Sequence, residues 1–60
     1  MTVRIDYTKE GMKHVREICG KYGIKPAMTI NGTWIHELSE EQYKCLEKAE
    51  QNGYLRRTIL

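Results

Sequence analysis

The chain is poor in the features that usually announce a chemical function or a special compartment. Among its 60 residues there is no Phe, one Pro and two Cys. Two cysteines allow at most one disulfide, so a small fold built on a framework of bridges is excluded. No apolar run approaches the length that spans a membrane, and there is no signal peptide. We therefore expect a cytoplasmic protein with reduced thiols and no membrane partner.

Groups of residues that could perform catalysis or bind metal are also missing. The only serine, Ser39, has a better use as a helix cap. His14 and Cys19 would lie about 140° apart around one helix, so they cannot act as base and nucleophile. Together with His36 and Cys45 they contain no close ligand pair of the kind zinc sites use. The five glycines are scattered and form no phosphate-binding loop. We expect neither an enzyme nor a cofactor.

Length and charge bound the remaining possibilities. The net charge is +2, and charged residues of both signs make up 30% of the chain. This balance does not by itself indicate nucleic-acid binding. Sixty residues form one domain, residues 1–60, and such a chain buries only about 60% of its unfolded surface. Because the core is marginal, we expect support from a second copy. The initial Met and the strand-like last residues suggest a whole small gene product.

Local patterns predict the first half of the fold. Apolar residues alternate over 2–7, which indicates a half-buried strand. Thr8 is a suitable N-cap for a helix that ends at Gly23. Asn31-Gly32 then separates two short strand-like runs, 27–30 and 33–36, and this pair favours a two-residue hairpin turn.

The second half has a clearer helix. Ser39 and Gln42 form a capping box, and Leu38 and Tyr43 occupy the positions of a hydrophobic staple. A helix is predicted from 40 to the Asn-Gly pair at 52–53, and a last strand over 54–60. In that strand Arg57 faces the same way as its apolar neighbours, so it must reach the rim or the strand must bulge.

The predicted order β-α-β-β-α-β is that of the ferredoxin-like split βαβ sandwich in miniature. We therefore expect an α+β fold with two helices on one face of an antiparallel or mixed four-stranded sheet. In the usual arrangement the first and third strands are central. Pro26 and the Arg56-Arg57 pair fit edge positions in the second and fourth strands.

The binding surface is expected on the uncovered face of this sheet. The alternation in the hairpin does not decide which face the helices cover. If they cover the side of Val3, Ile5 and Ile35, a large aromatic ring stands on the open face beside polar groups. The candidate binding residues are then Arg4, Thr29, Trp34, His36, Tyr54 and Arg56, with Asp6 next to His36 as a solvated pair.

Two functions compete for that face. Trp, Tyr and Arg are enriched at interface hot spots, which favours a small protein-binding regulator or inhibitor, expected as a homodimer. Small chains without a catalytic cluster are often regulators, including those encoded by phages and mobile elements. The alternative is a single-stranded nucleic-acid binder in which Trp34 and Tyr54 stack on bases and Arg4 and Arg56 contact phosphates. Trp34 could also simply pack across Thr29 within the hairpin.

Overall fold

The fold is known from a computed structural model, which describes residues 1–25 and 32–60. The elements follow the order β-α-β-α-α-β along the chain. They are β1 (Thr2–Tyr7), α1 (Lys9–Lys21), β2 (Thr33–Glu37), α2 (Glu40–Cys45), α3 (Glu47–Gln51) and β3 (Leu55–Ile59).

The sheet is antiparallel, with β1 in the centre and β2 and β3 on either side. The prediction of a four-stranded ferredoxin-like sheet is therefore wrong: the described residues form three strands, within a small α+β fold. The predicted strand over 27–30, with Pro26 and Asn31, lies outside the described residues. The first strand is central as predicted, whereas the predicted third strand, β2, lies at an edge of the sheet that the described residues form.

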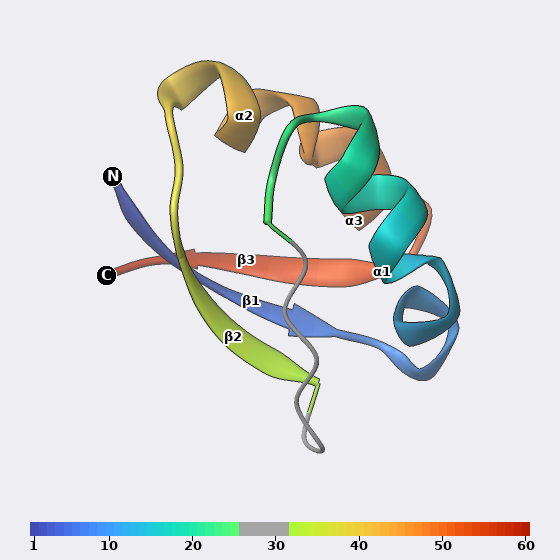
Figure 1. The fold of residues 1–60 in the computed structure, drawn as a ribbon. Helices are drawn as coiled ribbons and strands as arrows, with labels where there is room; N and C mark the ends of the chain where they lie inside the picture. Colours follow the sequence, from blue (N-terminus) through green and yellow to red (C-terminus); the bar gives the residue numbers. More distant parts are fainter. Residues whose placement is uncertain (26–31) are drawn as a thin grey trace.

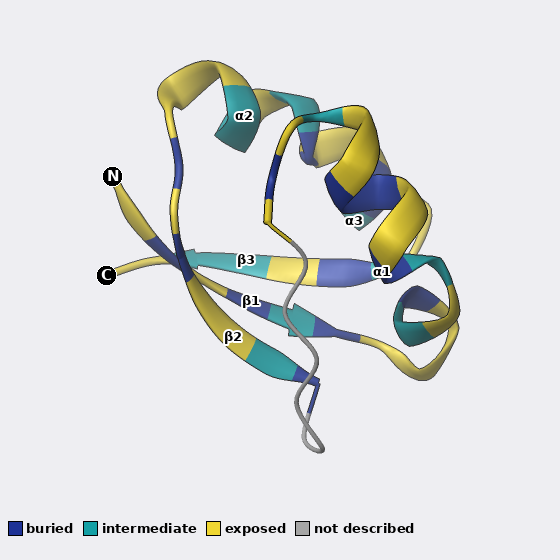
Figure 2. Ribbon diagram, in the orientation of Figure 1, coloured by how far each residue is buried: buried dark blue, intermediate teal, exposed yellow. Residues whose placement is uncertain are grey.

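The helices cover one face of the sheet, and the core lies between the two layers (Figure 1). Buried residues recur along β1 and α1 and also occur in α3 and at the start of β3 (Figure 2). Buried apolar side chains come from β1, α1, α3 and β3, together with residues from the connecting segments. The buried apolar residues are Val3, Ile5, Tyr7, Val15, Ile18, Cys19, Ile24, Leu38, Leu46, Ala49 and Leu55.

The helix ends follow the predicted caps. The Thr8 hydroxyl accepts the Gly11 amide at 3.0 Å, and Ser39 and Gln42 form the complete capping box. Gly23 has φ +67°, in the left-handed region where glycine is favoured at a helix end. The predicted second helix is interrupted at Leu46, whose buried side chain packs in the core where α2 gives way to α3.

Helix α1 is held tightly against the turn before β3. The Thr8 hydroxyl donates to the Gly53 carbonyl at 2.7 Å, and the Thr8 amide donates to the Tyr54 carbonyl at 2.9 Å. A Cβ on Gly11 would lie 1.6 Å from the Tyr54 carbonyl oxygen. Gly11 is therefore required for this approach, because any side chain would collide with backbone.

Candidate functional site

The register of the sheet corrects the predicted faces of β2. Val3 pairs with His36 and Ile5 pairs with Trp34, and directly paired residues of antiparallel strands share a face. Because Val3 and Ile5 are fully buried under the helices, Trp34 and His36 belong to the helix-covered side. The open face carries Ile35 instead, so the prediction that Trp34 and His36 lie there is wrong.

His36 is buried, with only 6% of its surface exposed. Its Nε2 atom finds no hydrogen-bond partner among the described residues. Burial lowers the pKa of this imidazole, because taking the charged form out of water is unfavourable. The predicted solvated pair with Asp6 is wrong, since Asp6 lies opposite Thr33 and Arg56 on the other face.

Trp34 is nevertheless accessible to solvent. Trp34 is 46% exposed, and the next residue, Ile35, is 56% exposed on the opposite side of β2. Arg4 and Thr33 line a shallow hollow with these two side chains. We call these four residues, Arg4, Thr33, Trp34 and Ile35, the Trp34 surface.

The open face beside this surface is polar and internally paired. Asp6 accepts the Thr33 hydroxyl at 2.7 Å and the Arg4 Nε at 3.3 Å. The Thr2 hydroxyl donates to Glu37 at 2.8 Å. The charged side chains of this face are two arginines, Arg4 and Arg56, and two acids, Asp6 and Glu37. The face remains open to solvent in the described part of the chain.

The other predicted site residues fall in different places. Arg4 and Arg56 lie on the open face as predicted, and Thr29 lies outside the described residues. Tyr54 precedes β3, and its ring packs against His14 of α1 with 4.8 Å between the ring centroids. The structure thus brings together Arg4 and Trp34, but it removes His36 and Tyr54 from the group.

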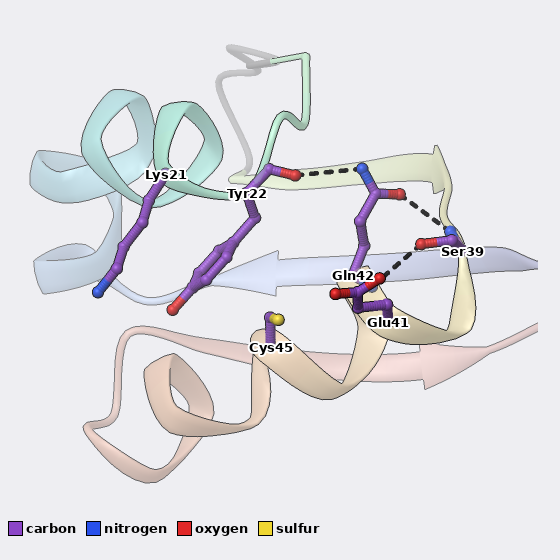
Figure 3. Close-up of a pocket in the computed structure, with 6 residues that line it drawn as sticks. All are labelled: Lys21, Tyr22, Ser39, Glu41, Gln42 and Cys45. Carbon is purple, nitrogen blue, oxygen red and sulfur yellow. Dashed lines mark hydrogen bonds between the residues drawn. The ribbon is translucent and has the colours of Figure 1, made fainter.

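A groove lies on the helix side, between the end of α1 and α2 (Figure 3). Its lining residues are Lys21, Tyr22, Ser39, Glu41, Gln42 and Cys45. The Gln42 side chain is already engaged, since it accepts the Ser39 amide and donates to the Tyr22 carbonyl at 3.2 Å. These contacts brace the two helices, and the groove shows no convergent set of unpaired polar groups that would indicate a ligand.

Arg57 forms a cluster that sequence reasoning missed. Its guanidinium lies 3.3 Å from a Glu50 carboxylate oxygen and donates to the Tyr43 carbonyl. It also stacks on the Tyr43 ring, with 4.2 Å between the Arg57 Cζ atom and the ring centroid. The conflict noted for this strand is resolved without a bulge, because the register of β3 is continuous. The charge in the core layer is balanced by Glu50, seven residues earlier in the chain.

The cysteines and histidines do not form a reactive site in the described part of the chain. Cys19 is buried with its sulfur 3.5 Å from the Tyr7 hydroxyl, and the pKa of Tyr7 is raised mainly by burial. His14 instead lies 3.5 Å from Glu17. Within residues 1–25 and 32–60, no three His, Cys, Asp or Glu side chains are grouped to hold a metal ion.

Among the described residues, no helix has the combined length and apolarity needed to cross a membrane. Comparison with known proteins adds no further constraint on the site. No protein-family model matches the chain, and neither a curated protein nor a solved structure is significantly similar to it.

Proposed function

We propose that the protein is a small non-enzymatic regulator or inhibitor that acts as a homodimer, and that the Trp34 surface makes the contact between the two copies. The supporting observation is that two consecutive residues with large apolar side chains, Trp34 and Ile35, are exposed beside Arg4. Trp and Arg are enriched at interface hot spots, and adjacent exposed apolar groups are costly to leave in water.

A second copy of the chain is the partner we propose. The open face next to the Trp34 surface carries two positive and two negative side chains, so two copies can meet there without net repulsion. A standard interface takes about 800 Å² from each partner. That is roughly a fifth of the 4271 Å² exposed by this chain, so the contact has to extend from Trp34 across the open face.

The alternative of a nucleic-acid platform loses its structural basis. It required Trp34 and Tyr54 to stand on the same face as Arg4 and Arg56. Trp34 belongs to the helix-covered side and Tyr54 packs on His14. Arg4 still lies beside Trp34, but Tyr54 does not join them, so one stacking ring remains where that proposal needs two.

The test is the mass of the protein in solution across a dilution series, measured by light scattering. We expect the wild type to approach the mass of two chains at high concentration. Trp34→Ala should remain a folded monomer over the same range, because the ring is half exposed. Ile59→Ala is the matched control: Ile59 is similarly exposed, at 57%, but lies at the opposite edge of the sheet.

Each outcome decides a part of the proposal. A Trp34→Ala chain that associates like the wild type would show that the contact lies elsewhere. A wild type that stays monomeric throughout would rule out the second copy as partner. Binding of single-stranded oligonucleotide that weakens steeply with added salt would instead favour the nucleic-acid function.

A further inference from the structure

The outer edge of β3 has a feature that the proposed function does not use. In the order β2-β1-β3, this edge lies across the sheet from Trp34. An edge strand presents alternate backbone N–H and C=O groups, which can template pairing with another strand. How these groups are satisfied decides whether the edge is open to such pairing.

The backbone hydrogen bonds show which amides of β3 face outwards. The Leu60 amide donates to the Thr2 carbonyl, and the Thr8 amide donates to the Tyr54 carbonyl. Even-numbered residues of this strand therefore bond to β1, since the two sides alternate in an antiparallel ladder. The amides of Leu55, Arg57 and Ile59 point away from the sheet.

The middle one of these three amides, that of Arg57, already donates a hydrogen bond to a side chain from the helix layer. The Arg57 amide donates to Glu50 Oε1 at 2.8 Å. The same carboxylate pairs with the Arg57 guanidinium at 3.3 Å, so both ends of the contact are fixed. Glu50 extends from α3, which packs beside β3, and its carboxylate occupies the position that a neighbouring strand's carbonyl would take.

We propose that Glu50 closes the β3 edge, and that opening this edge allows β3 of a second copy to add to the sheet in antiparallel pairing. The strand offers what such pairing needs. Its segment 55–60 contains Thr and Ile, which favour strands, and its last residues, Ile59 and Leu60, are 57% and 61% exposed. Addition is prevented because the incoming carbonyl meets a carboxylate at Arg57.

Three variants separate the closing contact from charge and helix effects. Glu50→Ala removes the acceptor, whereas Glu50→Gln keeps a carbonyl oxygen that can accept the Arg57 amide. Glu47→Ala removes an exposed acid from the same helix and is the control for charge. The mass is measured in the Trp34→Ala chain, so that association through the Trp34 surface does not contribute.

We expect Glu50→Ala to form dimers or larger assemblies at concentrations where the Glu50→Gln and Glu47→Ala chains stay monomeric. Under dilution to monomer, hydrogen exchange of the Arg57 amide should speed up about tenfold in Glu50→Ala relative to Glu47→Ala. Equal masses and equal Arg57 exchange in Glu50→Ala and Glu47→Ala would overturn the proposal. Should Glu50→Ala fail to fold, the wild type decides: an Arg57 amide that exchanges as fast as that of Ile59 would also overturn it.

Discussion

At the scale of single residues, the buried side chain of His36 should make the stability of the protein depend on pH. Burial lowers its pKa from the usual 6.5, so the folded protein holds His36 neutral. As pH falls below 6.5 the unfolded chain binds a proton that the folded chain resists, and stability is lost. We expect a loss of up to about 1.4 kcal/mol per pH unit between pH 6.5 and the lowered pKa.

The measurement is the free energy of unfolding in denaturant between pH 7 and 5.5, followed by Trp34 fluorescence. His36→Leu should flatten the profile in this window, and His14→Gln is the control at the other histidine. The carboxylates with lowered pKa, Glu37 and Glu50, titrate below 4.5, outside the window. An unchanged slope in His36→Leu would show that another group causes the pH dependence.

The same residue shows where sequence reasoning about the site failed. Over the predicted strand 33–36, either face offers one apolar and one polar residue: Thr33 with Ile35, or Trp34 with His36. The pattern alone therefore does not show which face of the strand is buried. The pairing assumed for the predicted hairpin assigned Ile35 to the buried face, which is wrong. The pairing with β1 decides, because Val3 and Ile5 lie opposite His36 and Trp34. Arg4 and Arg56, whose strands alternate clearly, were placed correctly.

At the scale of elements, the contact between α1 and the turn before β3 gives a prediction with an internal control. Gly11→Ala should destabilise the protein by about 2 kcal/mol or more, because the new methyl collides with the Tyr54 carbonyl. Gly20→Ala should stabilise it by up to about 1 kcal/mol, since nothing lies near that position and Ala favours helix. Denaturant unfolding of both variants measures the two effects. If both stabilised equally, the close approach at Gly11 would be contradicted.

The elements themselves were predicted well wherever a few neighbouring residues determine them. The strand over 2–7, the Thr8 cap, the Ser39–Gln42 capping box and the stop at Gly23 are confirmed, because each depends on side chains within one turn or one pleat. The interruption at Leu46 was not predicted. The break is slight, because Leu46 keeps helical dihedral angles and the amides of Leu46 and Glu50 still donate to carbonyls four residues earlier.

At the scale of the whole molecule, the α+β class followed from the order of elements, but the size of the sheet did not. The number of strands and their neighbours depend on contacts between residues far apart in the chain. The pairing of β1 with β2 illustrates this, since Val3 lies opposite His36 from the other half of the chain. Long-range pairing of this kind is invisible to periodicity.

The two free cysteines report on the cooperativity of this whole structure. Cys19 has no exposed surface and lies under Tyr7 between the two layers, whereas Cys45 is partly exposed at the end of α2. A thiol reagent should therefore modify Cys45 rapidly in the folded protein. Cys19 should react only when the layers separate. Its modification rate under native conditions should therefore be proportional to the equilibrium constant for unfolding. Labelling followed by mass spectrometry measures both rates, and the Cys45→Ser variant allows Cys19 to be followed alone. Gly20→Ala should slow the modification of Cys19 by the factor that its gain in stability predicts. Equal rates for the two thiols would mean that α1 opens away from the sheet without global unfolding.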